Sequence, residues 1–229
     1  DISFALQAGE SLGVVGATGA GKSTLVDLVA RTYDPDRGRI LVDGVDIRAL
    51  SLDDLRRTVS HVPQETFLFS ESVRDNVLFG MPDDGRLERA SEAAQLTEAL
   101  PSLPNGYDTL LGERGVNLSG GQKQRTAIAR ALAKDAPIFL LDDALSAVDA
   151  NTEARILAAL RSALVGKTTV IVSHRLAAIR DATRIIVIDH GRIVETGRHL
   201  ELMRREGRYW ELVRRQELEV ELEEVRSEE

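Results

Sequence analysis

The sequence predicts an α/β fold built around a largely parallel sheet. Short apolar runs alternate with longer amphipathic stretches, which is the order expected of repeated strand–helix units. Several of the runs are apolar throughout, as expected for strands that are covered by helices on both faces. With 229 residues, 43% of them hydrophobic, the chain is long enough for one large domain or two small ones with an ample core.

Six short runs are the expected strands, and five amphipathic stretches between them are the expected helices. The strands are Ser11–Val15, Arg39–Val42, Val59–Val62, Ile138–Asp142, Thr168–Ser173 and Arg184–Asp189. The helices are Lys22–Arg31, Leu52–Thr58, Gly120–Ala133, Asn151–Leu164 and Leu176–Arg180. The dipeptide His190-Gly191 precedes a further run, Arg192–Glu195, and predicts a hairpin at the edge of the sheet.

One region, from Thr66 to Lys134, interrupts the alternation. It contains no convincing strand, and loops that carry glycine and proline join its helical stretches. Those stretches are Ser72–Phe79, Gly85–Ala99 and Gly120–Ala133. We therefore expect a helical subdomain inserted into the α/β core. The chain ends, from Arg198 to Glu229, in a segment of helical character.

Composition excludes several classes of protein. The chain has no cysteine, so it has neither disulfides nor thiolate sites, and its four histidines are too scattered to suggest a metal cluster. The net charge of -8 lies mostly in Glu217–Glu229, and the nearly neutral remainder predicts no nucleic-acid partner. No run reaches the ~18 apolar residues of a membrane span, and no signal-peptide pattern follows Asp1. We expect a soluble, intracellular module.

A glycine-rich loop between the first strand and the first helix predicts a phosphate site. Its glycines let backbone N–H groups converge on a phosphate, and the following helix N-terminus adds further donors. Lys22 supplies a cation for the β- and γ-phosphates, and Ser23 a hydroxyl ligand for Mg²⁺. The residues expected to contact the nucleotide here are Gly16, Thr18, Gly19, Ala20, Gly21, Lys22, Ser23 and Thr24.

Two further motifs point to the same chemistry. Asp142 ends a buried strand, where the carboxyl edge of a parallel sheet binds ligands, and its carboxylate suits Mg²⁺. Leu118–Gln122 stands at the start of a helix, where Ser119 and Gln122 have the spacing of a capping box. Two consecutive glycines are costly for capping alone, but they make sense if a phosphate of another molecule approaches the backbone.

With these motifs, the chain resembles the nucleotide-binding domain of an ABC transporter, and Leu118–Gln122 stands as the ABC signature. Gln64 matches the Q-loop glutamine, and His174 matches the switch histidine. Ser146–Asp149 matches the D-loop, and Gly112–Gly115 resembles the X-loop of ABC exporters. The motifs follow in the order of the family, and the resemblance covers nearly the whole chain.

The resemblance implies a P-loop NTPase (RecA-like) core with an ABC helical subdomain and an antiparallel β-subdomain, truncated at its N-terminus. The single domain 1–229 would comprise a core of residues 1–64 and 135–216, a helical subdomain of residues 65–134 and an acidic tail of residues 217–229. The aromatic residue that stacks on adenine in this family is expected before Asp1. The chain thus looks like part of a longer polypeptide with membrane helices on its N-terminal side.

The resemblance also implies ATP and Mg²⁺ as ligands. Two such domains pair head to tail, with each ATP held between the phosphate loop of one chain and the signature of the other. The expected catalytic residues are Gln64, Asp143 and His174. The expected nucleotide contacts beyond the loop are Ser119, Gly120, Gly121, Gln122 and Asp149. The expected metal ligands are Ser23, Gln64 and Asp142. Transmembrane domains of this polypeptide and of its partner are further expected partners, at the cytoplasmic face of the inner membrane.

One residue departs from the family pattern. The family has a glutamate directly after the Walker B aspartate, which is Asp142 here, and this chain has Asp143 at that position. Its carboxylate is one methylene shorter, so we expect this site to bind MgATP and hydrolyse it slowly. Heterodimeric exporters pair such a chain with a glutamate-bearing one, and the complete signature fits that role. The alternatives are a homodimeric exporter with weakened or fully active sites, a soluble ABC protein of DNA repair or translation, and a nucleotide-dependent scaffold without turnover.

The acidic C-terminal segment allows two interpretations. Leu218, Leu222 and Val225 share one helical face among glutamates, which is typical of a solvated amphipathic helix. The same stripe could instead contact the tail of the partner domain.

Overall fold

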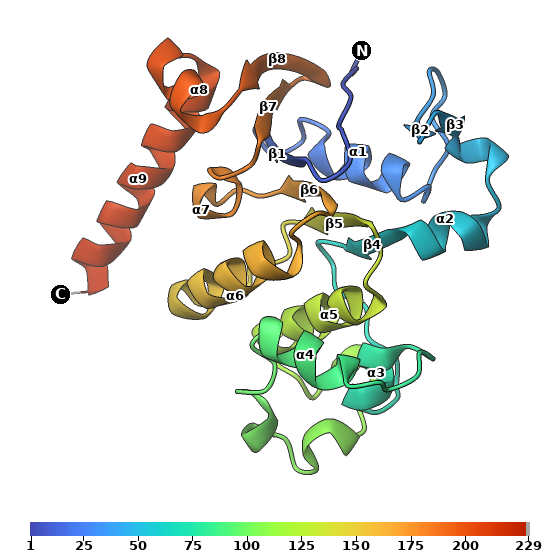
Figure 1. Ribbon diagram of the computed structural model, residues 1–229. Helices are drawn as coiled ribbons and strands as arrows, with labels where there is room; N and C mark the ends of the chain where they lie inside the picture. The colour runs from blue at the N-terminus through green and yellow to red at the C-terminus, as the bar shows by residue number, and fades with distance from the viewer. Residues whose placement is uncertain (228–229) are drawn as a thin grey trace.

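A six-stranded sheet with the order β4-β5-β6-β1-β7-β8 forms the centre of the molecule (Figure 1). The computed structural model describes the backbone of residues 1–227 and the side chains of residues 1–218. The strands are β1 Ser11–Val15, β4 Val59–Val62, β5 Ile138–Asp142, β6 Thr168–Val172, β7 Arg184–Asp189 and β8 Arg192–Gly197. The first five strands of this order pair in parallel, and β8 pairs antiparallel with β7. The predicted parallel sheet and its edge hairpin are confirmed.

One expected strand lies outside this sheet. Only Leu41 and Val42 of the predicted run Arg39–Val42 form a strand, β2, and it pairs antiparallel with β3 (Val45–Asp46). The connecting residues Asp43 and Gly44 have φ values of 49° and 80°. An Asp-Gly pair with two positive φ angles makes a tight hairpin turn, which folds the run back on its neighbour before it can reach the sheet.

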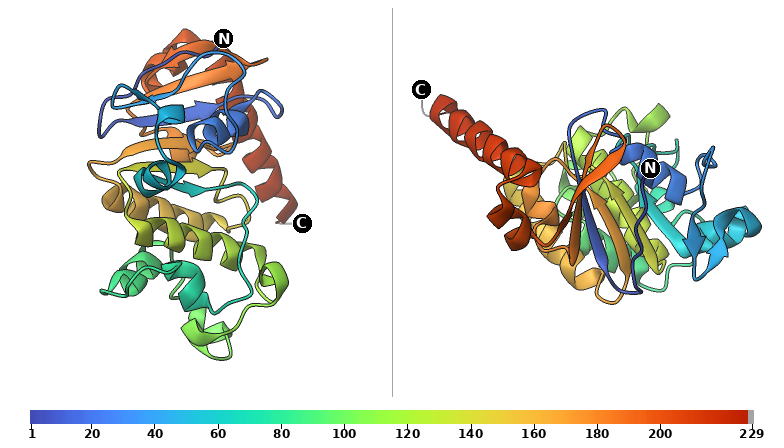
Figure 2. Two further views of the ribbon diagram at one scale, coloured as in Figure 1. Left: turned by 90° about the vertical axis from the view of Figure 1, so that its right-hand side faces the viewer. Right: turned by 90° about the horizontal axis from the view of Figure 1, so that it is seen from above.

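Helices cover both faces of the sheet (Figure 2). The helices of the core are α1 Lys22–Val29, α2 Leu52–Thr58, α6 Ala150–Ala163 and α7 Leu176–Ile179. Strand β5 illustrates the two-sided burial, because its side chains alternate between two apolar clusters. Leu140 packs with residues of α1 and α2, whereas Phe139 and Leu141 pack with residues of α5 and α6. The period of two along a strand buried on both faces explains why the run is apolar throughout.

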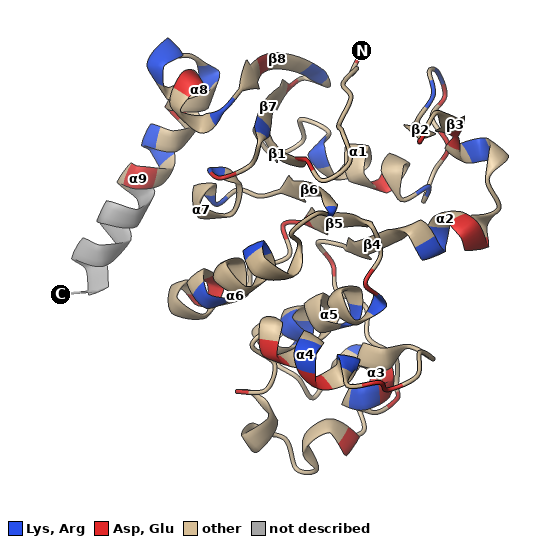
Figure 3. Cartoon of the chain, viewed as in Figure 1, with Lys and Arg blue, Asp and Glu red and all other residues tan. Residues whose placement is uncertain are grey.

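Residues 66–134 form the helical region that the sequence predicts. Its helices are α3 Val73–Leu78, α4 Arg86–Ala93 and α5 Gly120–Lys134, joined by the short 3₁₀ turns η2 Leu100–Ser102, η3 Gly106–Asp108 and η4 Glu113–Gly115. The predicted helix Gly85–Ala99 is six residues too long, because α4 ends at Ala93 and Gln95 has a φ of 54°. Figure 3 shows both signs of charge on α3 and α4, whereas the charged residues of α5 are all basic.

The C-terminal segment is helical, as predicted, but it is divided in two. Helix α8 (His199–Arg205) ends where Glu206 has a φ of 50°, and α9 (Arg208–Ser227) then runs away from the body of the molecule (Figure 2). Leu218 of the predicted apolar stripe is 58% exposed. The side chains of Leu222 and Val225 lie outside the described residues. No helix of residues 1–227 is both long and apolar enough to span a bilayer.

Candidate functional site

The phosphate loop lies between β1 and α1, in the strand–turn–helix setting that the sequence predicts. Two of its glycines are required by the backbone. A Cβ built on Gly16 would lie 2.1 Å from the carbonyl oxygen of Ile188 in β7, which no side chain can tolerate. Gly21 caps α1 with a φ of 99°, a conformation that costs an L-residue steric strain. The loop is therefore held tightly against the sheet on one side.

The other side of the loop is open. A Cβ at Gly19 or Gly21 would meet no atom within 4 Å, so a ligand can approach the backbone closely at both positions. The N-terminus of α1 points its first backbone donors into this space, where they favour an anion.

The side chain of Lys22 folds back onto the backbone of the loop. The residue is only 6% exposed, and its Nζ atom donates hydrogen bonds of 2.9 Å to the carbonyl oxygens of Gly16 and Ala17. Burial lowers the pKa of Lys22, while the charges of Asp143 and Asp142 act in the opposite direction. A phosphate in the loop would supply the negative charge that a buried ammonium requires.

A hydroxyl and a carboxylate meet beside the loop. Ser23 Oγ donates a 3.1 Å hydrogen bond to Asp142 Oδ1 at the end of β5. Asp142 is 5% exposed, and burial raises its pKa, more than the hydrogen bond from Ser23 lowers it. Paired oxygens of this kind, in a site that penalises an unneutralised carboxylate, fit Mg²⁺.

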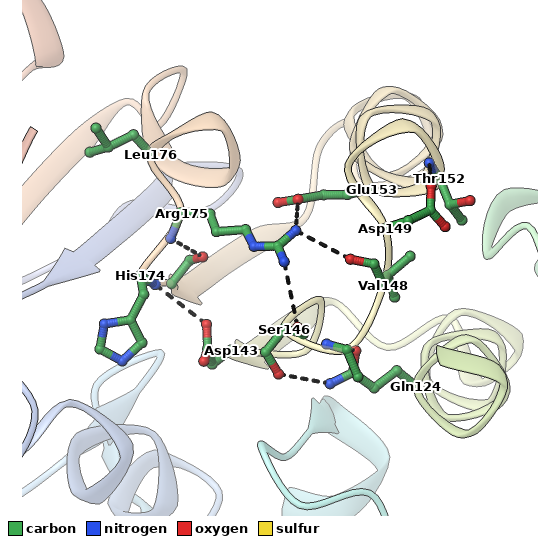
Figure 4. A network of polar contacts seen from close by, with 12 residues as sticks. Gln124, Asp143, Ser146, Val148, Asp149, Thr152, Glu153, His174, Arg175 and Leu176 are labelled. Atoms are coloured by element: carbon green, nitrogen blue, oxygen red, sulfur yellow. Dashed lines mark hydrogen bonds and ion pairs between the residues drawn. The ribbon is translucent and has the colours of Figure 1, made fainter. Parts of the chain in front are cut away.

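Asp143 directly follows Asp142 and connects the switch histidine, His174, to the site. It has a φ of 46°, its N–H donates to the Val172 carbonyl at 2.8 Å, and its Oδ1 accepts from the backbone N–H of His174 at 3.4 Å (Figure 4). The exposed side chain of His174 follows β6, and the exposed Gln64 follows β4. Because β4 and β6 flank β5, these predicted residues lie along one edge of the sheet.

The signature residues lie elsewhere, at the start of α5. The capping box is present: Ser119 Oγ accepts from the N–H of Gln122 at 3.2 Å, and Gln122 Oε1 accepts from the N–H of Ser119 at 2.8 Å. The Ser119 hydroxyl still carries a hydrogen that can be donated to another group. Among the described residues, no recorded hydrogen bond joins this motif to residues 16–24.

The two signature glycines also have a role within the chain. A Cβ at Gly121 would lie 3.1 Å from the carbonyl oxygen of Ala147, and one at Gly120 would lie 3.3 Å from Ala147 Cβ. The D-loop, Ser146–Asp149, therefore packs on the signature. This contact adds an intrachain reason for the glycines to the phosphate approach that the sequence suggested.

Asp149 caps α6 by accepting a 2.9 Å hydrogen bond from the N–H of Thr152, and this bond lowers the Asp149 pKa.

Three polar residues near the site were missed by the sequence reasoning: Gln124 on α5, Glu153 on α6 and Arg175 after His174. Gln124 and Glu153 are buried, at 5% and 6% exposure. Their positions on amphipathic helices gave no signal, because the pattern of a helix does not reveal which polar residues have buried partners.

The family model described as ABC transporter matches residues 1–146, more than half of the chain. The chain belongs to the ABC transporter family. Its P-loop NTPase fold is thereby established, and the ABC transporters are ATPases, as the sequence predicted.

Three similar ABC proteins indicate the branch of the family. The chain is 48% identical over 217 residues to an ATP-dependent lipid A-core flippase of Alkalilimnicola ehrlichii, covering 93% of this chain and 37% of that protein. It is 50% identical over 212 residues to ABC transporter B family member 19 of Arabidopsis thaliana, covering 92% and 17%. A structure of a bacterial Atm1-family ABC exporter with ATP bound matches with a TM-score of 0.87 and 44% identity, covering 91% and 37%. The chain thus corresponds to the nucleotide-binding domain of an exporter and spans less than two-fifths of these relatives.

Proposed function

We propose that this chain binds MgATP in its own site, hydrolyses it slowly, and completes the faster site of a partner domain with its signature. The observation that carries this proposal is the position of Asp143. Its carboxylate is short and contacts the backbone N–H of His174. An aspartate at this position ends one C–C bond short of a glutamate, which leaves its carboxylate less able to align a water on a γ-phosphate held in the loop.

The binding half of the site is intact. Backbone donors of residues 19–21 surround the phosphates, and Lys22 moves from the carbonyl oxygens of Gly16 and Ala17 to phosphate oxygens. Ser23 and Asp142 would hold Mg²⁺, with Gln64 as a further ligand from the end of β4. A metal held there would supply positive charge beside the phosphates. His174 reaches the γ-phosphate edge from the end of β6.

The hydrolytic half is weakened by geometry. Asp143 ends one C–C bond, about 1.5 Å, short of a glutamate at the same position. A misplacement of about 1 Å in a catalytic group can cost about 100-fold in rate. Mg²⁺ and phosphate contacts do not depend on this side chain, so slow hydrolysis and firm binding are compatible.

The signature acts in the opposite site. Head-to-tail pairing brings the exposed Ser119 and the start of α5 onto the nucleotide held by the partner's phosphate loop. The γ-phosphate then receives donors from both chains, and its loss on hydrolysis lets the pair open. This two-state pairing drives the membrane domains between their two access states. A partner chain with glutamate after its Walker B aspartate supplies the faster site.

An aromatic surface near the Q-loop is the proposed contact with transmembrane domains. Phe67, Phe69 and Phe79 are 51%, 39% and 59% exposed. The ring centre of Phe69 lies 5.0 Å from that of Phe67 and 5.2 Å from that of Phe79. The guanidinium of Arg130 lies 5.6 Å from the ring centres of Phe69 and Phe79 and donates to the backbone carbonyls of Phe67 and Asn76. Exposed apolar clusters on a defined scaffold mark interaction sites.

We propose that the domain lies at the cytoplasmic face of the inner membrane, where such a contact could form. Similar proteins are named for different cargoes, a lipid A-core flippase and a beta-(1→2)glucan exporter among them. The cargo of this chain is therefore not a property of the ATP-binding domain.

The test is ATP turnover of the chain with and without a glutamate-bearing ABC partner. The proposal predicts low turnover for the chain alone and high turnover for the pair, which falls when the partner's glutamate is replaced by glutamine. Equal turnover of the chain alone and of the pair would favour a homodimeric exporter with active sites. ATP binding without turnover in any pairing would favour a scaffold.

A further inference from the structure

Arg175, the residue after His174, contacts the D-loop and α6 through three acceptors at once. Its Nη1 atom donates to the Val148 carbonyl at 3.3 Å and forms an ion pair with Glu153, and its Nη2 atom donates to the Ser146 carbonyl at 3.5 Å (Figure 4). Two of these acceptors are backbone atoms of the D-loop, and the third is on α6. One guanidinium thus holds the D-loop beside the switch histidine.

The D-loop is held from its other side by α5. Gln124 Nε2 donates to Ser146 Oγ at 3.0 Å, and Gln124 Oε1 accepts from the N–H of Ala147 at 2.9 Å. Both ends of this buried amide are therefore used on the D-loop. Together with the contact between Gly121 and Ala147, they make the D-loop and the start of α5 one packed unit.

Glu153 orients the guanidinium. Its side chain is 7% exposed, and its Oε1 atom is buried without a hydrogen-bond partner among the described residues. Arg175 is therefore the group that compensates a buried carboxylate, which fixes the guanidinium strongly.

We infer that Arg175 is a positioning residue that couples the D-loop and signature unit to His174, and so couples the two ATP sites of the dimer. This inference rests on the proposed function, in which the signature and D-loop serve the partner's site while His174 and Asp143 serve the chain's own. The contacts form one path: α5 to Gln124, to the D-loop, to Arg175, and through the adjacent peptide to His174 and Asp143. Movement of the D-loop shifts His174 unless the contacts of Arg175 break.

The shape of arginine distinguishes this role from simple stabilisation. Its planar fork donates to Glu153 and to two carbonyls in fixed directions, whereas a lysine offers one compact charge. Arg175→Lys should keep the ion pair with Glu153 and lose the geometry of the carbonyl contacts. A reversed pair, Glu153→Arg with Arg175→Glu, restores the charges but places no donor at residue 175 for the Ser146 and Val148 carbonyls.

The experiment measures steady-state ATPase of the chain assembled with a glutamate-bearing ABC partner, so that turnover reports the partner's site. We expect Arg175→Lys to lower kcat at that site by about 5- to 150-fold, the usual range of a coupling between sites, with KM for ATP and the melting temperature little changed. The reversed pair should recover melting temperature and not kcat. Arg161→Ala is the matched control. Arg161 lies on α6, as Glu153 does, and forms an ion pair with Asp181 beyond α7 without contacting the D-loop.

Several outcomes would overturn the inference. A kcat for Arg175→Lys equal to wild type would show that the fork is not needed. Recovery of kcat by the reversed pair, or loss of folding in both variants, would assign the ion pair a purely structural role. If Arg161→Ala lowers kcat equally, the effect belongs to α6 as a whole. Failure of the proposed function is distinguishable, because the wild-type pair would then show no turnover that depends on its partner.

Discussion

Replacing Asp143 with glutamate tests the reason for the weak site. Asp143 Oδ1 accepts from the His174 N–H at 3.4 Å, the long end of a hydrogen bond, so this contact offers little resistance to change. A glutamate extends the carboxylate by one C–C bond, about 1.5 Å, towards the space in front of the phosphate loop. Since a shortfall of about 1 Å costs about 100-fold, turnover at this site should rise by about 100-fold, or about 2.7 kcal/mol in barrier.

The assay is steady-state ATPase of the assembled dimer, with the partner's own glutamate replaced by glutamine so that only this site reports. Binding of MgATP should change little. The matched control is Asp142→Glu, the same chemical change one residue earlier. Asp142 is 5% exposed and bonded to Ser23, so the longer side chain should weaken Mg²⁺-dependent binding and raise no turnover. An Asp143→Glu dimer that is no faster than the parent would refute the reach argument and place the limitation in another element.

Three other substitutions test separate parts of the account. Lys22→Ala should lower MgATP affinity by at least about tenfold, since the loop loses its buried cation beside the phosphate charges; unchanged binding in a nucleotide titration would contradict that role. Gly120→Asp should leave MgATP binding at the Lys22 loop intact and abolish most turnover of the pair, because it puts a side chain and a negative charge on the surface that meets the partner's nucleotide; full turnover would exclude sites formed in trans. Arg130→Gln should keep nucleotide binding and reduce transport by the membrane-embedded assembly, because it removes the cation that contacts the rings of Phe69 and Phe79. Normal transport would show that the aromatic surface is not the contact with the membrane domains.

Much of the fold was predictable because the strands β1, β5 and β7 are buried on both faces. The interiors of these runs carry no polar side chain, and the predicted bounds agree with the structure. The run at Arg39–Val42 misled for a local reason, since the Asp43-Gly44 turn forms a separate hairpin. Helix ends were less predictable. Helix α4 stops at Ala93 although the sequence up to Ala99 favours a helix. A turn after α4, and not a continued helix, brings Leu96 and Ala99 into the apolar cluster of the helical region.

The candidate site divides in the same way. Motifs whose chemistry needs a particular residue at a strand end, such as Lys22 and Asp142, were predictable from local sequence. Contacts between segments distant in sequence were not. Ser146 and Arg175 are 29 positions apart, and no sequence pattern between them indicates that they meet. The capping box at Ser119 was predicted, whereas the packing of Gly121 on Ala147 depends on how α5 and the D-loop meet in the fold.

The central claim is that one of the two sites in the dimer hydrolyses ATP and the other, the Asp143 site, retains it. A single-turnover experiment tests it directly. The dimer is loaded with radiolabelled MgATP, unbound nucleotide is removed, and the bound ATP and ADP are quantified against time. The account predicts that about half of the bound ATP is converted in a fast phase and that the remainder persists at least about 100-fold longer, by the reach argument above. Conversion of all the bound ATP in one phase at one rate would contradict the account.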